Sequence, residues 1–148
     1  MKNDQSIKSA GTVVLERTYN APAESVWAAL TDVNKLRKWY FNLSGFEPRV
    51  GYKFEFTGES DCAEYIHLSE VTEVIDRRKL TYSWSYKGYE GMSYVTWELF
   101  PEGGKTKLVL THAGLETFPK LADFTKDSFT AGWTYFLETA LKNFVESK

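Results

Sequence analysis

The sequence is poor in cysteine and has no long hydrophobic run. Its single cysteine, Cys62, excludes a disulfide within these 148 residues, and chains made in oxidising compartments usually carry paired cysteines. Residues 1–11 lack the apolar segment of a secretory signal. No stretch approaches the ~20 apolar residues that a transmembrane helix requires. We therefore expect a soluble, cytoplasmic protein without a membrane span.

An excess of positive charge is also missing. Lys and Arg number 18 against 20 Asp and Glu, which gives a net charge of −2 at pH 7. Nucleic-acid-binding domains usually carry a basic surface, so this balance argues against a nucleic-acid partner. Acidic residues gather between Phe54 and Asp76 and are followed by Arg77-Arg78-Lys79. We interpret this run as a solvated pair of strands; a divalent-ion site is the alternative, without EF-hand-like spacing to support it.

Motifs for catalysis and metal binding are absent. The two histidines, His67 and His112, have no Cys or carboxylate at a metal-ligand spacing. The chain contains no Gly-x-Ser-x-Gly elbow, P-loop or His-Glu-x-x-His motif. Cys62 lies among acidic residues, which disfavour a thiolate nucleophile. We therefore expect no metal and no cofactor. The sequence leaves open whether the protein is an enzyme, although the missing motifs argue against catalysis.

Aromatic residues, by contrast, are abundant. Phe 10, Tyr 9 and Trp 5 make up 16% of the chain. Ring surface on this scale excludes a disordered chain and implies a large core, a lined cavity, or both. The length of 148 residues is that of one domain. We expect a flexible tail over residues 1–11 and a single domain over residues 12–148.

The hydrophobic pattern changes its period along the chain. A strand is expected over Thr12–Tyr19, followed by two short helices. The first should have Pro22 at its first helical position with Asn20 or Ala21 as its cap, and Thr31-Asp32 should cap the second. Between Phe46 and Ala113, apolar and polar residues alternate, and turn-forming residues separate the runs. This alternation indicates a meander of five or six antiparallel strands.

An amphipathic stripe predicts a long helix at the C-terminus. Its apolar positions recur every three or four residues, at Phe129, Trp133, Phe136, Leu137, Ala140, Leu141, Phe144 and Val145. Asp127 or Ser128 is expected to cap the start of this helix. Together the elements predict an α+β fold in which helices cover one face of a single antiparallel sheet.

Several stretches, taken in order, resemble a known superfamily. They are Asn20-Ala21-Pro22 with Val26-Trp27, Leu30-Thr31-Asp32 with Leu36 and Trp39-Tyr40, Pro48 to Phe54, Leu80 to Trp84, Val95 to Leu99, Leu108 to Leu115, and Gly132-Trp133. Together they resemble the START-like, SRPBCC superfamily, and within it the activator of heat-shock protein 90 ATPase homologue-like family. Tyr52 departs from the family pattern, which usually has a glycine there. The resemblance covers residues 12–146.

This resemblance implies a helix-grip fold, in which a curved antiparallel sheet wraps around the long C-terminal helix. Proteins of this kind usually keep a cavity between sheet and helix for a hydrophobic or amphipathic molecule, lipid-like or aromatic. We therefore expect binding of such a small molecule. One alternative is a cyclase- or aromatase-type enzyme that uses the same cavity. Another is a chaperone ATPase co-regulator, as the family name suggests; that role is expected to need a further partner-binding domain, for which this chain leaves no room.

The candidate cavity walls lie on strand and helix faces that should point toward one another. They are Trp39, Tyr40, Phe54, Phe56, Tyr82, Trp84, His112, Trp133 and Phe136. The alternative for each ring is packing in an ordinary core. His112 is the one weak candidate for acid–base chemistry, because it continues the inward side of Leu108 and Leu110. The alternatives are a hydrogen-bonded strand-end role for His112 and a structural role for His67.

Overall fold

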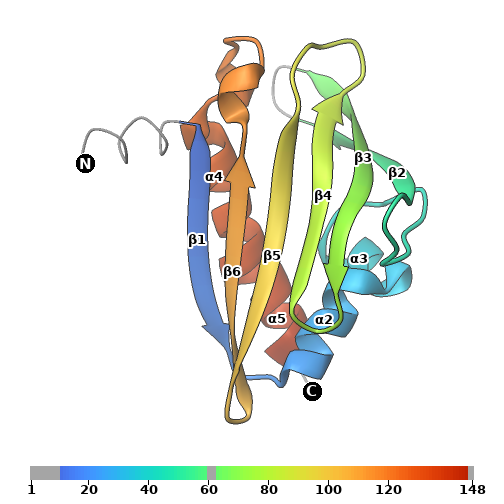
Figure 1. Cartoon of the computed structure of the whole chain (residues 1–148). Coiled ribbons are helices and arrows are strands. Elements are labelled where there is room, and N and C mark those ends of the chain that lie inside the picture. Colours follow the sequence, from blue (N-terminus) through green and yellow to red (C-terminus); the bar gives the residue numbers. More distant parts are fainter. Residues whose placement is uncertain (1–10, 60–62, 147–148) are drawn as a thin grey trace.

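Six antiparallel strands form one curved sheet, and a long C-terminal helix crosses its concave face (Figure 1). The computed structural model describes residues 11–59 and 63–146. The strands are β1 (Thr12–Tyr19), β2 (Lys53–Glu59), β3 (Glu64–Ile75), β4 (Lys79–Tyr86), β5 (Ser93–Glu102) and β6 (Lys105–Ala113). This arrangement confirms the predicted helix-grip fold. The predicted tail up to residue 10 and Cys62 lie outside the described residues.

The helices follow the predicted order. They are α2 (Ala23–Thr31) and α3 (Val33–Trp39) after β1, and α4 (Lys126–Tyr135), the π-helical turn η3 (Phe136–Ala140) and α5 (Leu141–Glu146) at the end of the chain. Two short 3-10 turns, η1 (Leu115–Thr117) and η2 (Ala122–Phe124), connect β6 to α4. None of the helices in the described part of the chain combines the length and the hydropathy that crossing a bilayer would require.

The observed N-cap is the predicted residue in α3, whereas in α2 and α4 it differs from the prediction. Asp32 caps α3, since its carboxylate accepts a 2.9 Å hydrogen bond from a backbone N–H of the first turn. Pro22 is the N-cap of α2 and not its first helical residue. The cap of α4 is Thr125 and not Asp127 or Ser128, because the Thr125 hydroxyl accepts the hydrogen bond of the Ser128 N–H.

The first strand lies beside the last one. The strand order across the sheet is β1-β6-β5-β4-β3-β2, and Val13 of β1 stands opposite His112 of β6. Where the chain leaves β1, the buried Thr106 hydroxyl donates a 2.8 Å hydrogen bond to the Ala21 carbonyl. Alternation predicts the meander, whereas the pairing of β1 with β6 joins distant segments and has no local signal.

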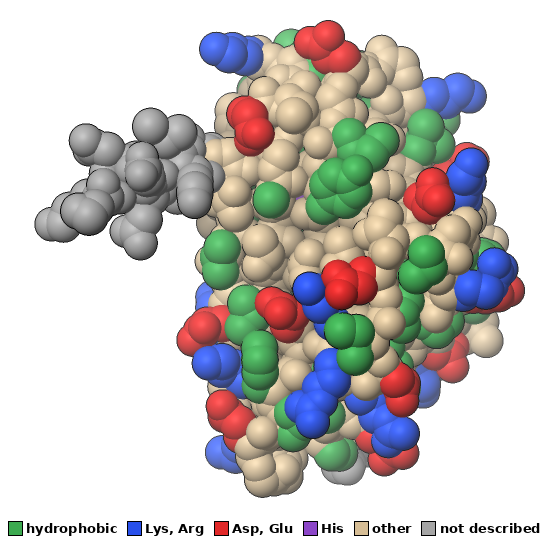
Figure 2. All heavy atoms as spheres, in the orientation of Figure 1, with side chains coloured by type: hydrophobic (Ala, Val, Ile, Leu, Met, Phe, Trp, Pro, Cys, Tyr) green, Lys and Arg blue, Asp and Glu red, His purple; other side chains and the backbone are tan. Residues whose placement is uncertain are grey.

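The outer face of the sheet is exposed to solvent. Figure 2 shows acidic and basic side chains interspersed on this face, with apolar groups between them. Val14, Tyr94 and Phe100 are among its exposed apolar side chains. The inner face holds the core, because alternate residues of each strand point to opposite faces. Trp97, Leu108 and other inward residues are fully buried there.

The π-helical turn of the C-terminal helix is hydrogen-bonded to β1. The buried Tyr19 hydroxyl donates a 2.7 Å hydrogen bond to the Leu137 carbonyl. Burial raises the pKa of this hydroxyl, so it keeps its proton. Arg17 of the same strand forms an ion pair with Glu138. The hydrophobic stripe predicts the helix but not the π turn, because a single extra residue barely disturbs the spacing of the apolar side chains.

Replacing Tyr19 with Phe removes the hydroxyl that holds this turn. We expect the free energy of unfolding to fall by about 1 kcal/mol, the typical net contribution of one such hydrogen bond. Urea denaturation followed by tryptophan fluorescence measures the loss. Tyr94→Phe is the matched control, because Tyr94 is 45% exposed on the outer face. Equal losses in both variants would contradict the role assigned to the Tyr19 hydroxyl.

Candidate functional site

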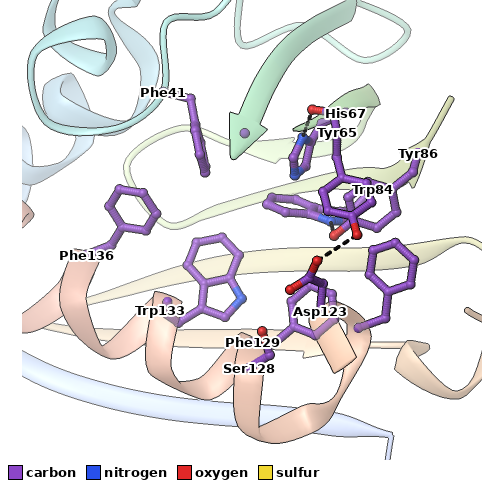
Figure 3. A pocket seen from close by; sticks show the side chains of 13 residues that line it. Phe41, Tyr65, His67, Trp84, Tyr86, Asp123, Ser128, Phe129, Trp133 and Phe136 are labelled. Atoms are coloured by element: carbon purple, nitrogen blue, oxygen red, sulfur yellow. Dashed lines mark hydrogen bonds between the residues drawn. The ribbon is translucent and has the colours of Figure 1, made fainter. Parts of the chain in front are cut away.

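A cavity of about 180 Å³ lies between the sheet and the N-terminal half of the C-terminal helix (Figure 3). On the sheet side it is lined by Gly58, Tyr65, His67, Trp84 and Tyr86, with Phe41 from the loop after α3. On the helix side it is lined by Ser128, Phe129, Gly132, Trp133 and Phe136, and η2 adds Asp123 and Phe124. Figure 3 shows the rings of Trp133 and Phe136 facing those of Phe41, His67 and Trp84 across this space.

The periodicities of strand and helix explain why these residues meet. Tyr65 and His67 are two residues apart in β3 and therefore share its inner face. Phe129, Trp133 and Phe136 recur at helical spacing and lie on one side of the helix. The sheet and the C-terminal helix therefore each present a row of side chains to the cavity.

Two glycines leave room in the wall. A Cβ atom at Gly132 would meet no atom within 4 Å, so the missing side chain keeps the helix side of the cavity open. A Cβ atom at Gly58 would lie 2.7 Å from Cε1 of His67. The absence of a side chain at Gly58 therefore lets the imidazole lie flat against β2, where its ring stacks on Phe56 with 4.5 Å between the centroids.

His67 is a neutral hydrogen-bond acceptor on the cavity wall. Its Nδ1 lies 3.2 Å from the Tyr65 carbonyl oxygen. Because a carbonyl only accepts hydrogen bonds, Nδ1 carries the proton and Nε2 has the free lone pair. Burial lowers the pKa of His67 to about 4, against smaller raising effects of the Tyr65 and Phe56 carbonyls. The imidazole is therefore uncharged at neutral pH.

The polar groups of the wall are few and mostly uncharged. The Trp84 indole N–H donates a 2.8 Å hydrogen bond to the Tyr86 hydroxyl, whose pKa burial raises. Asp123 is the only charged side chain among the described residues that line the cavity, and its carboxylate accepts a 2.7 Å hydrogen bond from the Tyr65 hydroxyl. Within residues 11–59 and 63–146, no group of His, Cys, Asp and Glu side chains could hold a metal ion.

His112 lies behind the wall and is fully buried. The Trp133 indole N–H donates a 3.0 Å hydrogen bond to Nδ1, so the proton of the neutral imidazole is on Nε2, which donates to Ser93 Oγ at 2.6 Å. Burial lowers the pKa of His112 to about 3, with a smaller contribution from His67. Both ring nitrogens are used within the protein, and His112 therefore holds Trp133 in place.

The rings expected to line a cavity divide into two groups. Trp84, Trp133 and Phe136 lie on the cavity wall, while Phe56 and His112 lie behind it. The other four expected rings, Trp39, Tyr40, Phe54 and Tyr82, meet in a second group together with Trp97, which is not among the candidates; we call these five residues the Tyr40 cluster.

The Tyr40 cluster is closely packed. The Tyr82 hydroxyl lies 2.9 Å from that of Tyr40 and accepts a 3.1 Å hydrogen bond from the Trp97 indole N–H. The space left beside Tyr40, Phe54 and Tyr82 is only about 10 Å³. A void of this size has no room for an organic ligand, and the cluster is part of the core.

Sequence reasoning missed several residues of the wall. They are Phe41, Gly58, Tyr65, His67, Tyr86, Asp123, Phe124, Ser128, Phe129 and Gly132. The alternation in β3 places Tyr65 and His67 on the same side as the buried Val71, and this signal could have identified them. Asp123 and Phe124 lie in a 3-10 turn, for which the sequence offers no comparable pattern.

Comparison with known proteins gives a family match and several structural neighbours. The family model described as Activator of Hsp90 ATPase homolog 1-like protein matches residues 20–146. No functionally curated protein matches the sequence. Protein MLL2253 from Mesorhizobium loti is 27% identical, with a TM-score of 0.74 over 91% of this chain and 96% of that chain. CalU16 from Micromonospora echinospora is also 27% identical, with a TM-score of 0.72 over 92% of this chain and 76% of that chain.

A longer neighbour shares only the fold. DynU16, a protein of the dynemicin biosynthetic locus, has a TM-score of 0.75 at 23% identity. The match covers 93% of this chain but 48% of DynU16, so this chain spans about half the length of that protein. At 23% identity the comparison shows a shared fold and gives no information about ligands.

The two buried histidines predict loss of stability in mild acid. Each has a folded-state pKa below its ordinary value of 6.5, so the unfolded chain takes up protons that the folded chain does not. The contribution of the two neutral histidines to the free energy of unfolding is therefore fully present above pH 6.5. It is lost as the pH falls toward about 4 for His67 and about 3 for His112. At pH 5 we expect a loss of about 2 kcal/mol per histidine relative to pH 7.5. Urea denaturation across this range measures it.

The variant His67→Leu is the control for this pH dependence. Removing one of the two titrating groups should reduce the slope of unfolding free energy against pH by about half. A wild-type stability that stays constant between pH 7.5 and pH 5 would contradict the assignment of both histidines as buried and neutral.

Proposed function

This chain belongs to the Activator of Hsp90 ATPase homolog 1-like protein family, and we propose that it binds a small hydrophobic molecule in the cavity between its sheet and its C-terminal helix. The family and its structural neighbours support a fold with a ligand-binding cavity. The observation that carries the proposal is the wall itself, which is made of aromatic rings with a few polar groups among them. Such concave, mostly apolar surfaces are typical of small-molecule sites.

The size of the cavity limits the ligand. An engineered apolar cavity of about 150 Å³ in another protein is large enough to bind benzene. A cavity of about 180 Å³ therefore suits a body of one or two fused rings, or a short aliphatic chain. Larger molecules would extend past the exposed Ser128 and Gly132 into solvent.

The two alternatives have less support. The cyclase- or aromatase-type alternative is expected to use His112 for acid–base chemistry, but both ring nitrogens of this residue already bind Trp133 and Ser93. His112 is fully buried and does not reach the wall. A role as chaperone ATPase co-regulator rests on the family name alone. Ligand binding is therefore the function that the geometry favours.

The substitution Gly132→Leu tests the site by filling it. The new side chain would enter the open space at this position, and Leu favours a helix interior over Gly by about 0.8–1 kcal/mol. We expect the variant to remain folded, with equal or greater stability, and to lose binding of naphthalene. Titration of 15N-labelled protein, followed through the indole N–H signals of Trp84 and Trp133, measures the binding.

Ala131→Leu is the matched control, because Ala131 is exposed, precedes Gly132 in α4 and does not line the cavity. It should bind naphthalene as the wild type does. Native mass spectrometry of the purified protein would in addition reveal any molecule that co-purifies. If neither naphthalene nor 2-naphthol perturbs the wild-type signals up to the limit of solubility, the proposed function is wrong.

A further inference from the structure

We propose that the cavity selects an uncharged, planar aromatic compound with a hydroxyl group, and that His67 and Tyr86 together recognise that hydroxyl. This inference rests on the proposed function and names the class of ligand. It follows from the hydrogen-bonding capacity that remains on the wall once the contacts within the protein are satisfied.

The acceptor is Nε2 of His67. Nδ1 is engaged by the Tyr65 carbonyl, and Figure 3 shows the opposite nitrogen turned away from this carbonyl and toward the cavity. Among the described residues no side chain or backbone group donates a hydrogen bond to Nε2. A ligand that fills the cavity and excludes water must therefore supply a donor at this position, or a polar nitrogen remains without a partner.

The donor is the hydroxyl of Tyr86. Its oxygen accepts the hydrogen bond of the Trp84 indole, which leaves the phenolic proton to be donated. No acceptor for this proton is found in the described part of the chain. Because burial raises the pKa of Tyr86, the proton stays on the oxygen at any physiological pH.

The sheet places this donor and this acceptor side by side. His67 of β3 and Tyr86 of β4 are direct cross-strand partners, and their ring centroids lie 4.8 Å apart. Both side chains line the cavity. A hydroxyl group is the simplest ligand group that donates one hydrogen bond and accepts another at the same atom, so it satisfies His67 and Tyr86 together.

The charge of the wall excludes anionic ligands. No Lys or Arg lines the cavity in the described residues, and the charged side chain that does line it is the carboxylate of Asp123. A fatty-acid carboxylate or a phosphate would lose its hydration without meeting a positive charge. The flat rings of Trp84 and Trp133 instead favour a planar aromatic body, which packs against them in offset or edge-to-face geometry.

Binding of three compounds of similar size tests the inference. We expect 2-naphthol to bind the wild-type protein with a Kd about tenfold or more below that of naphthalene, since sites that hydrogen-bond a hydroxyl discriminate against analogues that lack it. The anion 2-naphthoate should bind more weakly than either. Isothermal titration calorimetry, or the indole N–H signals used for naphthalene, gives the three constants on the unmodified chain.

Two variants assign the preference to its residues. In Tyr86→Phe and in His67→Leu, the Kd of 2-naphthol should come to within about twofold of the Kd of naphthalene measured on the same variant. Tyr89→Phe is the control, because Tyr89 packs on Tyr86 but is 40% exposed and does not line the cavity. It should keep the wild-type preference.

The outcomes separate this inference from the proposed function. If naphthalene and 2-naphthol bind with equal constants, the cavity binds ligands but the hydroxyl selection is wrong. If the advantage of 2-naphthol survives in both variants, the assignment to His67 and Tyr86 is wrong. If no aromatic compound binds, the proposed function itself fails.

Discussion

The cavity depends on a hydrogen-bond chain that joins the C-terminal helix to the sheet through a buried imidazole. Trp133 donates to His112, His112 donates to Ser93, and the Ser93 hydroxyl donates a 3.3 Å hydrogen bond to the Trp84 carbonyl. Breaking any link would leave a polar atom buried without a partner, which is costly in an apolar interior. The same Trp133 ring forms the cavity wall. The position of this wall is therefore set by the protein itself and does not require a ligand.

The two sides of the helix meet the sheet differently, and this difference creates the site. Toward β1 the helix is tied by Tyr19 and Arg17, and the space is filled by residues such as Leu137. Toward β3 and β4, missing side chains at Gly58 and Gly132 leave room between the rings. Tight packing on one side fixes the helix, so the other side can keep a void without collapse.

The sequence predicts the elements better than it predicts the cavity. The limits of β1, the capping role of Asp32 and the extent of the C-terminal helix follow from local spacing and capping chemistry. The choice of rings that surround the cavity does not follow from local spacing, because it depends on the curvature of the sheet and on the pairing of distant segments. Periodicity cannot distinguish the ring of Tyr40 from that of Trp133, yet Tyr40 belongs to a packed cluster and Trp133 lines the cavity. His67 is hard to identify because apolar residues, Ile66 and Leu68, occupy the outward positions on either side of it, which weakens the alternation of this strand.

Burial fixes the protonation states of His67 and Tyr86, the acceptor and the donor proposed to select the ligand. In water an imidazole changes its charge near neutral pH, but in this wall desolvation keeps His67 neutral and the Tyr65 carbonyl fixes its tautomer. Tyr86 is held in its protonated form by the same effect. The cavity therefore presents one fixed acceptor beside one fixed donor over the whole physiological pH range. Because water is displaced when a ligand enters, a partner that matches both groups is favoured over one that is merely apolar.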